Sequence, residues 1–212
     1  MRIGISKPSI ECLWDFRWLK AFAVSEWDFS TILGLNSRER KQVSRHLTET
    51  HHRTILSAGA GFFPADPAAE EKGLPIAILE RLELASEMAQ FFATDTLLLR
   101  VPTRFENHPT VFRELSAYLP KNLGLALDPG SAHFRIDTPR ASWVADPLWH
   151  PPSFLRKKSI FKVHGWHESR WIRYYGPLQL EKLRTVCKKM KPGILLFGHS
   201  KREEEAATFL QA

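Results

Sequence analysis

Residues 96–130 read TLLLRVPTRFENHPTVFRELSAYLPKNLGLALDPG, and this stretch decides the fold. The apolar run over 96–101 is typical of a buried strand, and a proline stops it. Apolar residues then recur at helical spacing over 111–119, with another proline just beyond. A second apolar run over 123–127 ends at an Asp-Pro-Gly turn. Strands that are apolar on both faces and joined by a helix predict a parallel sheet covered by helices.

The same alternation continues on both sides of this stretch. Further strands are expected over 142–145, 159–163 and 193–197, and further helices over about 75–93, 180–190 and 203–210. Two proline-rich breaks, 63–75 and 146–152, are interpreted as loops within a single barrel-type domain over residues 1–212. The order of elements alone leaves two α/β architectures open, an eight-fold barrel and an open doubly wound sheet.

The composition is that of an ordinary globular protein. The chain has 212 residues, of which 43% are hydrophobic and 25% charged, and this excludes a disordered tail, a collagen-like rod and a disulfide mini-protein. Cys12 and Cys187 stand far apart and no CxxC pair occurs, which argues against a cysteine zinc site. No apolar run approaches the roughly 20 residues that span a bilayer. We therefore expect no membrane partner and a cytoplasmic location.

Positive charge gathers in the last third of the chain. Residues 1–65 carry +3, residues 66–150 carry −4 and residues 151–212 carry +8, which gives the total of +7. Such a region attracts phosphate, in nucleic acid or in a small ligand. A solvated basic face explains the same charge, since Lys188, Lys189 and Lys191 end a predicted helix, where cations suit the helix dipole.

Several segments in order carry a resemblance to a known family. They read GAGFFPADP (59–67), LLLRVPTRF (97–105), LALDPGS (125–131), IFKVHGW (160–166) and ILLFGHS (194–200), with a Tyr pair at 174–175. Over about residues 27–210 the chain resembles the YecE-like family, also called domain of unknown function 72. The resemblance implies a TIM-type (β/α) barrel of parallel strands, and it implies no particular reaction.

The chain departs from this family at several points. Arg100 stands where the family has glutamine before the proline, Lys162 replaces the arginine of its R-x-H-G motif, and Gly198-His199 replaces its Asn-Asn pair. The amino-terminal part is also short, because 1–6 and Ile10-Glu11, taken as the first two strands, lie too close together for a helix between them. We therefore expect the barrel to be incomplete or open on its N-terminal side.

In a barrel of this type the functional residues lie at the carboxyl ends of the strands. The predicted catalytic residues are His164, Asp128, Asp146 and His199. A carboxylate beside a histidine orients it as a general base. The predicted substrate-binding residues, suited to an anion, are Arg100, Lys162, Gly165, Arg170, Tyr174, Tyr175 and Ser200. No cofactor or metal is expected, since the assigned strand ends lack glutamate.

Each candidate also has a structural interpretation. Asp128 and Asp146 both precede proline and suit turns, and His164 suits a histidine hydrogen-bonded to backbone at the barrel mouth. Ser200 with Glu203 has the spacing of a helix capping box. The aromatic residues near Tyr174 and Tyr175 pack on one another as readily as on a base or sugar ring.

Three functions remain open from the sequence. The first is an enzyme, such as a hydrolase, acting on a phosphate-bearing substrate such as a nucleic-acid phosphodiester. The second is a non-catalytic nucleic-acid-binding protein, whose surface would hold basic residues interleaved with aromatic ones: Arg156, Lys157, Lys158, Arg170, Arg173, Trp166, Trp171, Tyr174 and Tyr175. The third is a carbohydrate-processing barrel, for which Asp128 and Asp146 are the candidate carboxylate pair. The oligomeric state is left open.

Overall fold

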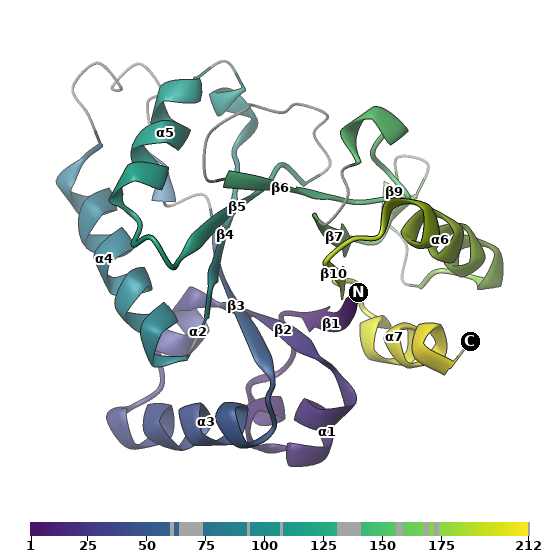
Figure 1. Ribbon diagram of the computed structural model, residues 1–212, viewed down its shortest axis with the longest axis horizontal. Coiled ribbons are helices and arrows are strands. Elements are labelled where there is room, and N and C mark those ends of the chain that lie inside the picture. Colours follow the sequence, from purple (N-terminus) through teal and green to yellow (C-terminus); the bar gives the residue numbers. More distant parts are fainter. Residues whose placement is uncertain are drawn as a thin grey trace.

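Eight parallel strands close into a barrel in the order β1-β10-β7-β6-β5-β4-β3-β2, with helices outside it (Figure 1). The computed structural model describes residues 1–59, 62–63, 74–92, 94–106, 108–130, 141–155, 159–167, 170–171 and 174–211, apart from the side chains of 109, 166–167 and 170–171. The TIM-type barrel expected from the sequence is confirmed, and the open doubly wound sheet is excluded by the closed strand order.

The barrel strands are short and mostly buried. They are β1 Arg2–Ser6, β2 Val24–Asp28, β3 Arg53–Ala58, β4 Thr96–Arg100, β5 Gly124–Asp128, β6 Ala141–Ala145, β7 Ile160–Val163 and β10 Ile194–Phe197. A separate antiparallel pair, β8 Trp166–His167 and β9 Arg170–Trp171, follows β7. The strands predicted from the sequence over 96–101, 123–127, 142–145, 159–163 and 193–197 agree with these bounds to within one residue.

Helices follow most of the barrel strands. They are α1 Phe16–Ala21, α2 Phe29–Leu33, α3 Ser37–Glu49, α4 Ile76–Phe91, α5 Pro109–Tyr118, α6 Pro177–Met190 and α7 Arg202–Gln211, with 3-10 turns η1 Ile10–Trp14, η4 Thr103–Phe105 and η5 Pro152–Phe154. Local sequence sets their ends. Asn36 and Glu39 form a capping box at the start of α3, and proline opens α5 and α6. None of the described helices is long and apolar enough to cross a membrane.

The N-terminal side of the barrel is closed, so the expected gap there is wrong. Ile10-Glu11, interpreted from the sequence as the second strand, lies in η1. The second strand is β2, further along the chain, and η1 and α1 fill the space between it and β1. β2 reads VSEWD. Because Ser25 and Glu26 are buried polar residues, a search for apolar runs does not find this strand. Glu26 is neutralised by Lys162, which comes from across the barrel.

The interior of the barrel has two layers because alternate residues of a strand point inward. One layer is apolar, and its members come from seven strands: Val24, Ile55, Leu98, Ala126, Val144, Ile160, Ile194 and Leu196. Two residues further along four of these strands stand Glu26, Arg100, Asp128 and Lys162. The alternation therefore places a charged layer directly above the apolar one, at the carboxyl ends of the strands.

Candidate functional site

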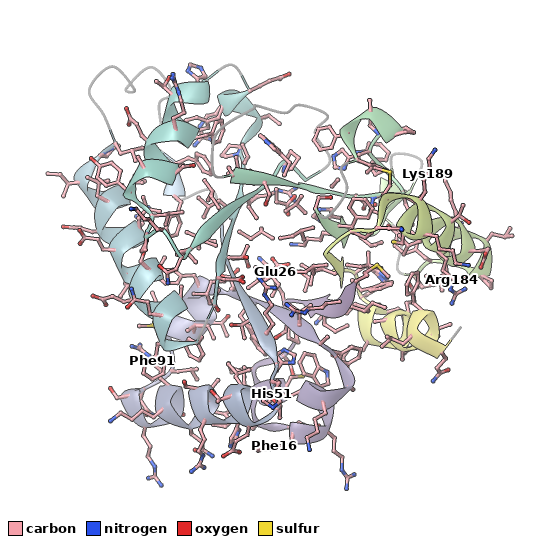
Figure 2. The ribbon with its side chains drawn as sticks, viewed as in Figure 1. Phe16, Glu26, His51, Phe91, Arg184 and Lys189 are labelled. Carbon is pink, nitrogen blue, oxygen red and sulfur yellow. The ribbon has the colours of Figure 1, made fainter. Side chains whose placement is uncertain are left out.

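A lysine ammonium lies between two carboxylates in the charged layer. Lys162 Nζ on β7 is 2.8 Å from Glu26 Oε1 on β2 and 3.5 Å from Asp128 Oδ2 on β5. All three side chains are buried, with Glu26 fully inaccessible to solvent. Figure 2 shows Glu26 inside the ring of strands. The strands β2, β5 and β7 are not neighbours in the sheet, so these contacts cross the barrel interior.

The charges of this triad hold one another ionised. Burial alone raises the pKa of Glu26, but the adjacent Lys162 ammonium lowers it below its usual range. Burial likewise favours neutral Lys162, yet the two carboxylates raise its pKa above the ordinary lysine value. Lys162 therefore remains an ammonium at neutral pH, which makes it a fixed positive charge rather than a base or a nucleophile.

Asp128 links this triad to His164. The Asp128 carboxylate lies 3.3 Å from His164 Nε2 and 3.4 Å from Arg100 Nη1, and it accepts a 2.8 Å hydrogen bond from the Gly130 amide. Burial acts to raise the pKa of Asp128, but His164, Lys162 and Arg100 together hold it well below its usual range. Asp128 thus combines both interpretations left open by the sequence, a turn residue and the charged partner of a histidine.

The backbone at His164 is fixed by Asp146. Oδ2 of Asp146 accepts a 2.9 Å hydrogen bond from the His164 amide, and Oδ1 accepts one from the Leu148 amide. The Asp146 amide itself donates to His150 Nδ1 at 2.7 Å. Burial raises the pKa of the Asp146 carboxyl despite these hydrogen bonds. Asp146 therefore positions the His164 main chain, and its oxygens are already engaged by backbone amides.

A second cluster, formed by Tyr175, His199 and Glu205, supports the turn at His164-Gly165. The Gly165 amide donates to Tyr175 Oη at 3.1 Å, and Gly165 has a φ of 87°, which favours glycine. The Tyr175 amide donates to Glu205, whose other oxygen lies 2.9 Å from His199 Nε2. These three residues are buried, so His199 lies in the supporting cluster and contacts Tyr175 and Phe197 edge-on.

The amide of Gly165, a predicted anion-binding residue, is already engaged inside the protein, and so is the amide of Gly198. Gly165 N donates to Tyr175, and Gly198 N donates to Val163 O at 2.9 Å. Ser200 lies in the turn before α7, and Tyr174 is 65% exposed. The side chain of Arg170 lies outside the described part of the chain, as do residues 156–158 and the side chains of 166–173. Of the predicted anion-binding residues, the structure brings Arg100 and Lys162 to Asp128, the partner of His164.

Two site residues escaped the sequence analysis. Glu26 is the third residue of β2, a strand that was not recognised, although it stands two positions after Val24 and two before the helix-capping Asp28. Glu205 belongs to the run Glu203–Glu205, which looks like a solvated helix start. Its spacing to Ala206 and Phe209 places it on the buried face of α7, and this was the available signal.

The described donors at the mouth do not form a metal-binding set. In the described ranges no group of three or more His, Cys, Asp or Glu side chains could hold a metal ion. The cation that lies between Glu26 and Asp128 is the lysine ammonium.

The closed barrel with its site at the carboxyl ends of the strands defines a protein of the TIM-barrel class. No family model and no curated protein matches the sequence. The solved structures that it resembles include D-psicose 3-epimerase from Clostridium cellulolyticum H10, at 8% identity and a TM-score of 0.67, covering 100% of this chain and 97% of the other. The probable 3-DHS dehydratase AsbF from Bacillus anthracis matches at 10% identity and 0.67, covering 99% and 98%.

A DUF72 family protein from Thermotoga maritima also matches, at 15% identity and a TM-score of 0.60, covering 99% of this chain and 97% of the other. The resemblance to the YecE-like family is thereby confirmed at the level of the fold. At these identities the likeness to all three structures concerns the fold alone, and activity has to be argued from the site.

Proposed function

We propose that the protein is an enzyme that performs general acid–base catalysis at the barrel mouth on a substrate carrying a phosphate group. The observation that carries this proposal is the pair formed by His164 Nε2 and Asp128 Oδ1, 3.3 Å apart. A histidine oriented by an ionised carboxylate is suited to take up and release a proton. Asp128 remains charged because its pKa is held well below the usual range.

In this proposal Asp128 orients the imidazole through Nε2 and stabilises the imidazolium that forms when His164 takes a proton. Nε2 is buried and its contact with Asp128 at 3.3 Å is electrostatic. No hydrogen bond to the other ring nitrogen, Nδ1, is found within the part of the chain that the structure describes, so Nδ1 is the atom that we propose exchanges a proton with the substrate. Asp146 holds the His164 backbone, which fixes the direction of the ring.

Arg100 is the proposed anion-binding residue. Its guanidinium contacts Asp128 through Nη1 and is 45% exposed, so donors remain for a phosphate oxygen. The guanidinium lies against Gly130, where an added Cβ would meet it at 1.7 Å, so a larger residue at that position would displace it. Glycine at position 130 thus leaves room for Arg100 beside the pair formed by His164 and Asp128.

The charge balance of the mouth favours an anion when His164 is protonated. Glu26 and Asp128 offset Lys162 and Arg100, so the five groups are neutral with neutral His164 and carry one positive charge with imidazolium. Anion binding and protonation of His164 should therefore support each other by linkage. Binding of the substrate phosphate would therefore favour the protonated form of His164, which is the proposed general acid.

A carbohydrate-type substrate is the second candidate. The structures of a D-psicose 3-epimerase and a probable 3-DHS dehydratase share the fold over the whole chain. The mouth also contains two buried carboxylates, Glu26 and Asp128, on either side of one ammonium. Asp146, paired with Asp128 in the sequence analysis, is engaged by backbone amides and is not the second carboxylate of this candidate.

The test is a turnover screen with three substrate sets: phosphodiesters including a short RNA, phosphomonoesters including sugar phosphates, and unphosphorylated ketoses. Wild type is compared with His164→Gln, Asp128→Asn and the exposed, charge-matched control Glu80→Gln. We expect turnover of a phosphorylated substrate that both site variants lower by at least about 100-fold, in keeping with loss of a general acid–base group. Turnover that survives in both folded site variants contradicts the proposal. Turnover of ketoses alone would favour the second candidate, a carbohydrate-type substrate.

A further inference from the structure

A basic cleft opens at the opposite end of the barrel from the candidate site. It has a volume of about 670 Å³ and lies at the amino ends of the strands, beside α1 and the end of α3. Its charged and titratable lining residues include Arg2, Lys20, His51, Arg53 and Asp95. Figure 2 labels His51, which directly follows the cap of α3. This volume falls within the range of sites for small molecules.

A second hollow continues the basic cleft across the barrel end. It measures about 470 Å³ and is lined by the first residues of several strands, including Thr96, Gly124 and Ile194. Arg2 and Arg53 line both hollows, so their side chains stand where the two meet. The pair of arginines therefore separates two adjoining concave regions.

The cleft carries unbalanced positive charge. Arg53 forms an ion pair with Asp95, so these two charges offset each other. Arg2 and Lys20 are exposed, and neither side chain makes a hydrogen bond or ion pair within the described ranges. The cleft thus holds a net charge of +2 with neutral His51, and His51 adds a further ring donor. A concave surface focuses such a field more strongly than a flat one.

We infer that the basic cleft binds a small compound carrying two or more linked phosphates. Arg2 supplies planar donors that match phosphate oxygens, and Lys20 supplies a point charge on the same cleft. The small size of the cleft, about 670 Å³, favours a small polyphosphate over nucleic acid, whose backbone requires an extended basic track. The inference concerns a different end of the barrel from the proposed catalytic site and does not depend on that function.

The experiment measures binding of inorganic tripolyphosphate and of ATP by calorimetry at low and moderate salt. The cleft variant is Arg2→Gln with Lys20→Gln. Its matched control is Lys41→Gln with Lys121→Gln, two exposed lysines that do not line the cleft, so both variants lose two positive charges. Arg100→Gln serves as the control for binding at the barrel mouth. Melting temperatures confirm that each variant is folded.

We expect tripolyphosphate to bind wild type with an affinity that falls as the salt concentration rises. The cleft variant should bind tripolyphosphate about tenfold more weakly, which is the loss expected when two exposed charge pairs are removed. The matched control should stay within about twofold of wild type on the same scale. Arg100→Gln removes the proposed anion donor of the mouth, so it should weaken binding there and retain the binding that the cleft variant loses. Equal losses in the two double variants would reveal a general charge effect and overturn the inference. It is also overturned if wild type binds neither probe, or if Arg100→Gln alone loses affinity. Tighter binding of ATP than of tripolyphosphate would indicate a nucleotide, and the reverse would indicate a polyphosphate.

Discussion

Replacing Lys162 by methionine should reveal what holds the charged layer together. The ammonium lies 2.8 Å from Glu26 and 3.5 Å from Asp128. With an effective dielectric constant of about 20, these distances correspond to gross attractions of roughly 6 and 5 kcal/mol, before desolvation and the repulsion between the carboxylates are subtracted. Methionine keeps the apolar stem and leaves two buried carboxylates without their shared cation. We therefore expect a loss of about 3–5 kcal/mol in the free energy of unfolding.

The assay is urea denaturation at about pH 8 and about pH 5, followed by circular dichroism. Without Lys162, the folded pKa of the two carboxylates rises above the unfolded value, so the loss should be smaller at the lower pH. The double variant Glu26→Gln with Lys162→Met removes one charge of each sign and should recover more than half of the loss. A loss below about 1 kcal/mol, or a double variant as unstable as the single one, would refute the reasoning.

Three further predictions follow from the same contacts. Tyr175→Phe leaves the Gly165 amide without its acceptor and should lower the free energy of unfolding by about 1–3 kcal/mol in urea melts, whereas exposed Tyr174→Phe should be neutral; equal effects would contradict the assigned role of Tyr175. Acid unfolding followed by fluorescence should show that the free energy of unfolding falls below about pH 4, because the pKa of Asp128 is lower in the folded than in the unfolded state, so the unfolded chain binds the proton first. Asp128→Asn should make the free energy of unfolding less dependent on pH in this range. An unchanged pH dependence in this variant would exclude the lowered pKa. Sulfate binding at the mouth, measured by titration calorimetry, should weaken several-fold in Arg100→Gln, because the exposed guanidinium supplies the donors for the anion, whereas the exposed control Lys41→Gln should bind as wild type does; an unchanged affinity of Arg100→Gln would argue against this role of Arg100.

The central and carboxyl-terminal part of the fold was readable from the sequence. The strands β4 and β5 are continuous apolar runs that stop at a proline or an Asp-Pro turn, so pattern alone located them. Arg100 and Asp128 are the last residues of β4 and β5, so the predicted bounds of these strands also located the two residues at the barrel mouth. His164 was selected as a polar residue that ends an apolar strand, and the structure brings it to Asp128.

The remaining parts depend on contacts between residues far apart in the chain. β2 looks polar because Glu26 is balanced by Lys162, which lies 136 positions away. Glu205 was hidden in an acidic helix start, since only packing of α7 against the barrel shows that it is buried. The role of Gly165 also changed, because its amide is taken by Tyr175 and is not free for a ligand. Local patterns carry no information on such pairings across the barrel.

The most direct test of the account is a crystal structure of the protein soaked in phosphate at about pH 6. The account predicts a phosphate at the barrel mouth in contact with Arg100 and His164, with His164 still beside Asp128 and Lys162 still between Glu26 and Asp128. A mouth without an anion, with His164 turned away from Asp128, would contradict it even if phosphate occupied the basic cleft at the other end of the barrel.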